Sequence, residues 1–266
     1  MKPFAPLALF LTVSMTQPAV AETVTVGFSP PVGQAMIYRI EQVRPMDGQE
    51  CRFIAERELR FERDGDGYIL HATLRRIIAD APAVASDPFS VALTPLLDVE
   101  QNFRVDAGGR IVALDDADGV WRAVEAGFAK MAVGFDPDTS KHRAAARVLA
   151  LFQALSDEGR LALLAGELKP LLLFARAPLA DGPGRGVETV AGTPFARPVP
   201  VNGSVVIAAR MGDRLTVDEK LAGAGVTVDI RYQLSATTGL IGNQRRHLVM
   251  GAQWLTETRT LLPAQP

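Results

Sequence analysis

Apolar and polar residues alternate along two well-separated regions of the chain, and this period of two predicts β-strands. From Phe53 to Phe61 apolar residues alternate with charged ones, as in a strand with one buried and one solvated face. Arg57 is the only charged residue on the apolar side. The glycines of the segment 64–67 suit a tight turn, and the alternation resumes after it. We therefore predict a β-hairpin over 52–77.

Further strands are predicted on both sides of this hairpin. A weaker apolar alternation at 36–40 precedes it, and a second hairpin follows at 103–114, with its turn at 107–109. The C-terminal third returns to the same period, most clearly at 226–234. Its other predicted strands are 204–211, 213–221, 240–250 and 253–262. The succession of strands and short turns indicates an antiparallel meander.

Between the two strand regions, apolar residues recur at helical spacing, and we expect three helices. The predicted helices and their N-caps are 120–131 with Asp118, a second helix with Thr139 or Ser140, and a third from Arg160 to about Phe174 with Ser156 or Asp157. The third helix is interrupted at Pro170 and is apolar around most of its circumference. Such a helix must be buried or must cover an apolar surface.

Together these elements predict an α+β fold, in which two or three helices pack on one face of an antiparallel sheet. A curved half-barrel is one form that such a sheet can take. We expect a signal peptide at 1–21 and a single domain at 22–266, with one continuous sheet favoured over two. Within the domain the predicted regions are β-rich 35–115, helical 119–175, a Pro/Gly-rich connection 178–203, and β-rich 204–262.

This order of strands, helices and strands resembles that of periplasmic lipoprotein carriers and the related mycobacterial lipid-binding lipoproteins. The resemblance spans most of the mature chain and concerns topology, with no family-specific motif. It implies a sheet curled into a half-barrel whose apolar concave side is covered by helices. The lipid anchor of the mycobacterial members has no counterpart in this sequence.

The N-terminus has the features of a cleavable secretory signal. Lys2 is followed by an apolar run from Phe4 to Val13, and Ala19-Val20-Ala21 is a small-x-small cleavage site. The run is too short to cross a bilayer, which takes about 20 residues. An N-terminal core helix is the alternative interpretation. We expect a periplasmic or secreted protein, cleaved near Ala21, with no transmembrane span in the mature chain.

Composition narrows the function classes. The net charge is −2 and the arginines are spread along the chain, so no basic face for a nucleic-acid partner is expected. Only 6% of residues are aromatic, which argues against a sugar-binding site built on stacked rings. Cys51 is the single cysteine, and no internal disulfide can form.

No catalytic motif is present. The serine hydrolase, penicillin-binding, zincin and C-x-x-C signatures are missing, and His71, His142 and His247 are far apart in the sequence. The segment 116–119 with Glu125 partly matches a calcium loop, but a turn and a capped helix explain the same residues better. We predict no enzyme, no metal and no cofactor.

The excess of apolar residues in the third helix suggests a binding protein for a lipid or another apolar small molecule. If that helix covers a curved sheet imperfectly, a dry cavity would remain beneath it. The expected lining residues are Phe61, Leu70, Leu164, Leu171, Phe174 and Tyr232. The competing interpretation is that these residues only form the core. A cell-envelope interaction or assembly module, which binds an envelope protein and has no small-molecule site, is the alternative function.

Overall fold

A computed structural model describes residues 23–46, 48–82, 89–90, 93–133, 136, 138–180, 184–191 and 199–264. The signal peptide predicted at 1–21 lies outside the described residues.

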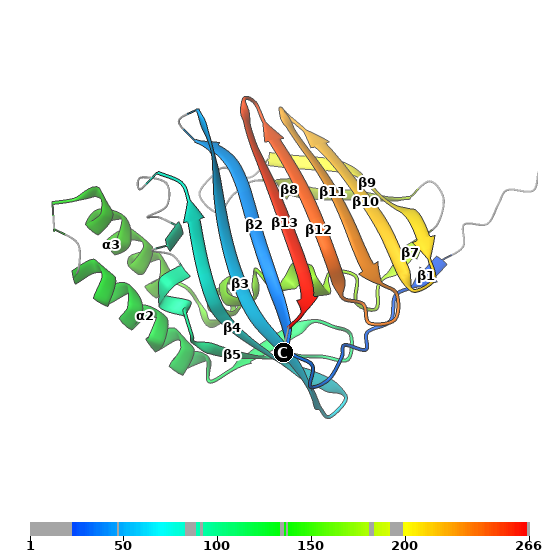
Figure 1. The fold of residues 1–266 in the computed structure, drawn as a ribbon, viewed down its shortest axis with the longest axis horizontal. Coiled ribbons are helices and arrows are strands. Elements are labelled where there is room, and N and C mark those ends of the chain that lie inside the picture. Colours follow the sequence, from blue (N-terminus) through cyan, green and yellow to red (C-terminus); the bar gives the residue numbers. More distant parts are fainter. Residues whose placement is uncertain are drawn as a thin grey trace, which may run out of the picture.

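Within the described residues, eleven strands form one antiparallel sheet in the order β6-β5-β4-β3-β2-β13-β12-β11-β10-β9-β8 (Figure 1). The strands are β2 (Met36–Met46), β3 (Gln49–Asp64), β4 (Gly67–Asp80), β5 (Glu100–Val105), β6 (Ile111–Asp115), β8 (Arg185–Ala191), β9 (Val199–Met211), β10 (Arg214–Gly223), β11 (Val226–Ser235), β12 (Ile241–Met250) and β13 (Gln253–Pro263). A separate pair is formed by β1 (Thr23–Thr25) and β7 (Pro178–Ala180). β13 pairs with β2, so the strands from the two ends of the chain belong to the same sheet.

Both predicted hairpins are present, and their turns explain why. Gly65 and Gly109 adopt positive φ angles of 55° and 80°, a conformation that costs glycine little because it has no Cβ atom. The first hairpin, β3 with β4, is longer than the predicted 52–77.

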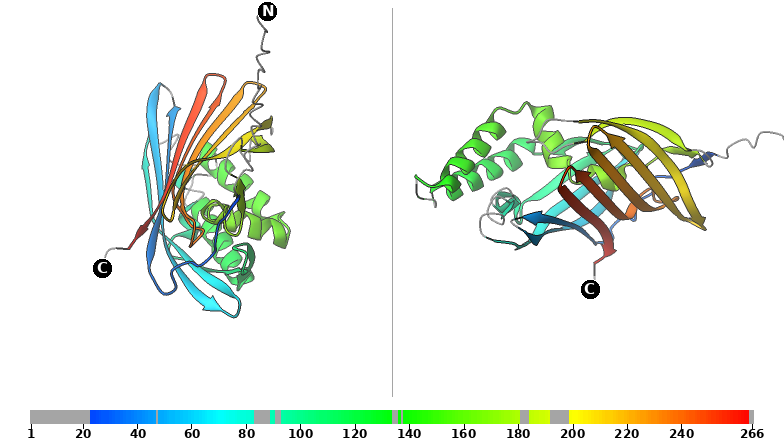
Figure 2. Two further views of the ribbon diagram at one scale, coloured as in Figure 1. Left: turned by 90° about the vertical axis from the view of Figure 1, so that its right-hand side faces the viewer. Right: turned by 90° about the horizontal axis from the view of Figure 1, so that it is seen from above.

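The helices lie on one face of the curved sheet, which we call the concave face (Figure 2). The helices whose bounds the structure describes are η1 (Thr94–Leu96), α2 (Ala117–Val133), α3 (Ser140–Gln153), α4 (Asp157–Ala165) and η2 (Lys169–Leu172). The open, mostly antiparallel sheet with helices on one side confirms the predicted α+β class. None of the described helices is long and apolar enough to cross a membrane.

A side chain caps the N-terminus of α2, α3 and α4, and the caps of α3 and α4 are among those predicted. Thr139 Oγ1 accepts a hydrogen bond from the backbone N–H of His142 at 3.2 Å, and Ser156 Oγ accepts one from Gly159 at 3.2 Å. The predicted cap Asp118 is wrong, because α2 begins earlier. Asp116 accepts the hydrogen bond from the Gly119 N–H, at 3.1 Å, and Asp118 lies inside the first turn.

Two other sequence expectations need correction. The third helix ends at Ala165 and is followed by a separate 3₁₀ turn at 169–172, because Gly166 and Pro170 weaken a continuous α-helix. The stretch 178–203, expected to be a connection, contributes β7, β8 and the start of β9. The glycines and prolines of this stretch indicate turns and loops, so these short strands were not evident from the sequence.

The hydrophobic core has two main parts. The larger lies between β2–β5 and the helices, and its buried residues include Phe61, Leu70, Phe103, Phe128, Leu168 and Leu171. The other part, made of two neighbouring clusters, lies on the concave side of β9–β12, partly beneath the β1–β7 pair, and includes Val26, Phe174, Leu215, Val217, Tyr232, Val226 and Val228. The two halves of the sheet therefore have separate apolar clusters.

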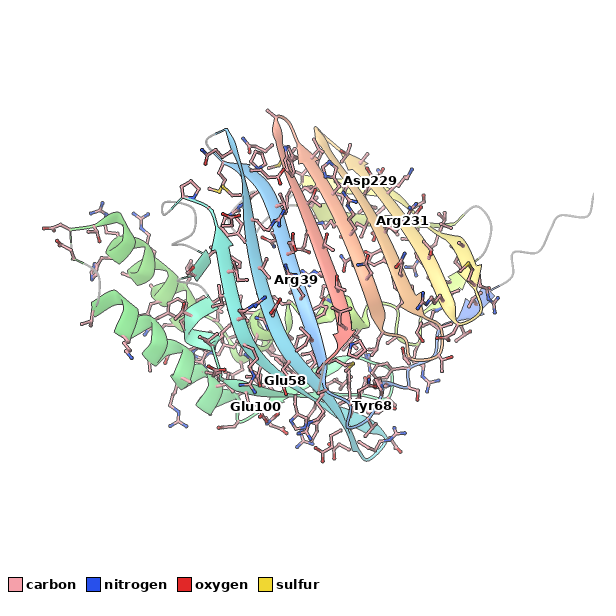
Figure 3. The ribbon with its side chains drawn as sticks, in the orientation of Figure 1. Arg39, Glu58, Tyr68, Glu100, Asp229 and Arg231 are labelled. Atoms are coloured by element: carbon pink, nitrogen blue, oxygen red, sulfur yellow. The ribbon has the colours of Figure 1, made fainter. Side chains whose placement is uncertain are left out.

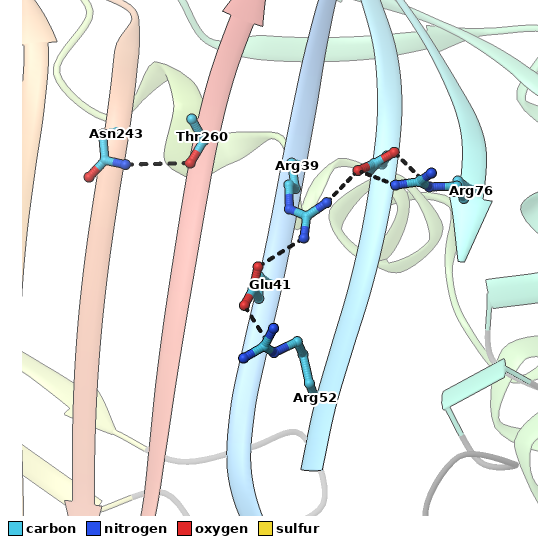
Figure 4. Close-up of polar contacts among 7 residues, drawn as sticks. Arg39, Glu41, Arg52, Arg76, Asn243 and Thr260 are labelled. Carbon is cyan, nitrogen blue, oxygen red and sulfur yellow. Dashed lines mark hydrogen bonds and ion pairs between the residues drawn. The ribbon is translucent and has the colours of Figure 1, made fainter. Parts of the chain in front are cut away.

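The convex face, turned away from the helices, carries many polar and charged side chains (Figure 3), and ion pairs cross-link its strands. Arg39 bridges Glu41, at 3.0 Å, and Glu56, at 2.6 Å. Glu41 also pairs with Arg52 at 3.3 Å, and Glu56 with Arg76 at 2.9 Å, so that one network joins β2, β3 and β4 (Figure 4). This face is solvated, as the charged positions of the alternating pattern predict.

Candidate functional site

The six predicted ligand-lining residues are buried, but they lie in two groups. Phe61, Leu70, Leu164 and Leu171 belong to the larger apolar cluster. Phe174 and Tyr232 belong to the second and pack edge-to-face with ring centroids 5.0 Å apart. Leu164 lines a pocket of about 440 Å³ between β6 and α4, and Tyr232 lines a pocket of about 290 Å³ beneath η2. The sequence-predicted set therefore does not surround one common space.

The feature that sequence analysis did not predict is a group of polar side chains at the centre of the concave face. It lies between the two apolar halves, on the strands where the N-terminal and C-terminal parts of the sheet meet. We call it the concave polar cluster. Its members are Gln42, Arg57, Glu167, Gln244, Arg246, Glu257 and Arg259. Burying charges costs free energy unless they are paired and hydrogen-bonded, so this cluster is the candidate functional site.

An ion pair on β13 forms the centre of the cluster. The Arg259 Nε donates to Glu257 Oε1 at 2.8 Å, and the two side chains are only 12% and 6% exposed. Gln42 Nε2 donates to the other Glu257 oxygen at 2.7 Å. Both carboxylate oxygens of Glu257 are therefore satisfied.

The electrostatics of this pair keep both groups charged. Burial raises the pKa of the Glu257 carboxyl, but the nearby Arg259, Gln42 and Arg246 outweigh burial and leave the pKa below its ordinary value. Burial lowers the pKa of the Arg259 guanidinium. Tyr38 and Glu257 raise this pKa by more than burial lowers it, so the pKa lies above its ordinary value. The pair thus contributes no net charge to the site.

The segment 166–173, which we call the cover segment, is attached to this cluster through Glu167. The Glu167 carboxylate forms an ion pair with the buried Arg57. The Glu167 backbone carbonyl accepts a hydrogen bond from Arg259 Nη1 at 2.8 Å. Two arginines of the sheet therefore position the cover segment over the concave face.

The pocket of about 290 Å³ lies between the cover segment and strands β11, β12 and β13, and we call it the cover pocket. Its lining consists of Gly166, Lys169, Pro170, Leu173, Ile230, Tyr232, Gln244, Arg246, Glu257 and Arg259. Pro170, Leu173 and Ile230 are its apolar lining residues, and the sheet contributes the polar side chains of Gln244, Arg246, Glu257 and Arg259. The volume is near the lower limit for small-molecule sites.

Tyr232 lies at the border between the pocket and the second apolar cluster. Its hydroxyl donates to Glu219 Oε2 at 2.6 Å. Burial, together with this bond to a carboxylate, raises the pKa of Tyr232 far above its ordinary value. The phenol therefore stays protonated and acts as a hydrogen-bond donor.

Arg57 is the one member of the site that the sequence singled out, as the only charge on an apolar strand face. Arg246, Glu257 and Arg259 gave no such signal, because β12 and β13 carry polar residues on both faces. Which of these residues face the helices depends on the register with the neighbouring strands.

The histidines do not form part of this site. His71, on the convex side of β4, has Nδ1 2.7 Å from Asn102 Oδ1 and Nε2 3.2 Å from Glu62 Oε2. His247 Nδ1 lies 3.1 Å from Thr256 Oγ1. Among the described residues, no group of three or more His, Cys, Asp or Glu side chains is arranged to hold a metal ion.

Comparison with known proteins adds no family to this picture: no family model matches the chain, and no curated protein matches it significantly.

Proposed function

We propose that the protein binds a small molecule with an apolar part in the cover pocket, between the cover segment and the concave face of the sheet. The single observation that carries this proposal is the composition of that pocket. Leu173 and Ile230 offer apolar contact beside the buried polar side chains of Gln244 and Glu257. Specific small-molecule sites combine apolar walls with a few fixed polar groups in this way.

The form of the cover segment supports the proposal. Leu168, Leu171 and Leu172 are buried in the core, whereas Leu173 is 53% exposed at the pocket. A ligand that covers Leu173 would remove apolar surface from water, which is favourable. Binding an apolar molecule beneath a helical cover is also what the resemblance to the lipoprotein carriers implies.

Titration with decanol, followed by native mass spectrometry and calorimetry, tests the proposal. We expect one molecule to bind, and Leu173→Gln to weaken its binding by about fivefold to tenfold through lost apolar contact. Leu163→Gln is the matched control, since Leu163 is 43% exposed on α4 and does not line the cover pocket. Failure of decanol and of its charged analogues of equal chain length to bind, or equal effects of the two substitutions, would reject the proposal.

A cell-envelope interaction module is the second candidate, and one observation favours it. Among the described strands β8 pairs only with β9, and Val190 on β8 is 62% exposed. An open edge of this kind can accept a strand from a partner. A stoichiometric envelope partner that is retained by the native chain and lost in Val190→Lys would support this function.

We also propose that the protein acts in the periplasm or outside the cell, after removal of residues 1–21. The sequence of the N-terminal segment supports this location. The intact mass of the protein recovered from a periplasmic extract is the test. A chain that begins at Glu22 is expected, and an uncleaved chain in the cytoplasmic fraction would contradict it.

A further inference from the structure

We infer that the ligand of the cover pocket carries an anionic headgroup, which Arg246 and Lys169 bind. This inference rests on the proposed function and adds the chemical class of the ligand. It follows from the charges that line the pocket and from which of them have partners.

The positive charges in the pocket exceed the negative ones. Three cations, Lys169, Arg246 and Arg259, line it together with one carboxylate, Glu257. Arg259 and Glu257 neutralise each other at 2.8 Å. Glu219 is a further carboxylate beside the pocket, because it accepts a hydrogen bond from the lining residue Tyr232. Even if Glu219 is counted, one positive charge is left over.

Arg246 and Lys169 are the cations of the pocket that no described carboxylate contacts directly, although Arg246 lies opposite Glu257 on the neighbouring strand and lowers the pKa of that carboxyl. In the part of the chain that the structure describes, neither forms an ion pair or a side-chain hydrogen bond. Arg246 is half-buried on β12, and Lys169 is exposed at the start of η2. The two therefore approach the pocket from opposite sides, one from the sheet and one from the cover segment.

A buried polar group in the same pocket also lacks a partner. Gln244 is 6% exposed and lines the pocket, and its Oε1 has no hydrogen-bond partner among the described residues. Buried polar atoms are rarely left unpaired in native structures, and each such atom indicates a missing partner. The Gln244 oxygen can only accept, so a deprotonated carboxylate cannot be its partner, whereas a hydroxyl or a protonated phosphate oxygen of the ligand would supply the missing donor.

These groups fit a carboxylate or a phosphate. A guanidinium offers a planar pair of N–H donors that matches either group, and an ammonium adds a point charge. The apolar residues Leu173 and Ile230 then contact the hydrocarbon part of the same molecule. The site thus fits an anionic amphiphile, such as a fatty acid or an alkyl phosphate.

The experiment compares four probes of equal chain length: decanoate, decyl phosphate, decanol and decyltrimethylammonium. At neutral pH we expect each anion to bind at least about tenfold more tightly than decanol, and the cation to bind most weakly. Added salt should reduce the preference for the anions, because Lys169 is exposed to solvent. The ratio of decanoate to decyl phosphate affinity distinguishes a carboxylate from a phosphate headgroup.

Substitutions assign the effect to the two cations. Arg246→Gln and Lys169→Gln should each weaken the binding of the anions more than the binding of decanol, and Arg246→Lys should restore part of the anion affinity. Arg245→Gln is the matched control, because Arg245 is the next residue on β12 and is exposed on the convex face. Lys169 is exposed, so its variant tests the inference without risk to folding.

The outcomes separate the two proposals. Equal affinity for decanoate and decanol, or a preference that survives in the Arg246→Gln/Lys169→Gln double variant, would overturn the anionic headgroup while leaving the proposed function intact. Failure of all four probes to bind would overturn both.

Discussion

Arg57, on β3, and Glu167, in the cover segment, form an ion pair on the concave side of the sheet. Arg57 is 5% exposed, although Glu167 remains 37% exposed at its side chain. The pair thus joins a buried charge of the sheet to a segment near the surface. It explains why a charged residue occupies a position in β3 that the alternating pattern reserves for apolar side chains.

Removing Glu167 should loosen the cover segment. Glu167→Ala leaves the buried Arg57 without a counterion, and because Glu167 is partly exposed we expect a loss of about 1–3 kcal/mol in the free energy of unfolding. Urea unfolding measures the loss, and hydrogen exchange should quicken at the amides of 166–173. Glu188→Ala, on the exposed edge strand β8, should change stability by less than about 0.5 kcal/mol. Unchanged exchange in Glu167→Ala would show that the ion pair does not hold the cover segment.

The Glu257–Arg259 pair should make stability depend on pH. Because the pKa of Glu257 is lowered in the folded protein from its ordinary value of 4.5, the unfolded chain binds more protons just below that pH. The stabilisation from Glu257 is therefore present above pH 4.5 and is lost as the pH falls through the lower, folded-state pKa. Glu257→Gln should cost about 3 kcal/mol at neutral pH, since Arg259 loses its counterion.

Urea unfolding of the native chain and Glu257→Gln across the acidic range measures this effect. The difference between the two proteins should shrink as the pH falls below the ordinary pKa of Glu257. A difference that stays constant into strong acid would contradict the assignment of a charged Glu257.

Gly203 should be intolerant of any side chain. A Cβ atom added there would overlap the backbone carbonyl of Lys220 on the neighbouring strand β10. Gly203→Ala must therefore displace β9 from β10, and we expect a loss of about 2–3 kcal/mol, similar to that of overpacked core positions. At Gly186, on β8, an added Cβ atom would meet only open space. Gly186→Ala should leave the midpoint of thermal unfolding nearly unchanged, and equal midpoints for the two variants would refute the prediction.

The N-cap of α3 offers a test of local helix stability. Thr139→Ala removes the acceptor for the His142 N–H and should cost about 1 kcal/mol. Thr139→Ser retains the hydroxyl and should cost much less. Circular dichroism during urea unfolding compares the two variants, and identical stabilities would indicate that the hydroxyl does not cap the helix.

Much of the secondary structure was predictable because its causes are local. The alternation from Phe53 to Phe61, the glycines at 65 and 109, and the caps Thr139 and Ser156 act over a few residues, and each identified its element. β7 and β8 were missed, since short strands among glycines and prolines leave little periodic signal.

The candidate site was less accessible to sequence reasoning. Leu164 and Tyr232 each line a pocket, but the other four predicted residues line neither of these two pockets. The apolar pattern identifies residues that face the interior, and it does not separate those that fill the core from those beside a pocket. Arg57 was recognisable from the sequence because it interrupts a strongly alternating strand. Arg246 was not, because the strand around it is polar on both faces.

The sequence by itself determined the α+β class, the two main hairpins and the presence of an apolar cover, because hydrophobic periodicity and turn chemistry are properties of neighbouring residues. Only the tertiary structure decided that β13 pairs with β2, and this pairing places Arg259 within reach of Glu167. It also brings Lys169 and Arg246 to one pocket. Contacts between residues so distant along the chain depend on strand order and register, which no local pattern encodes.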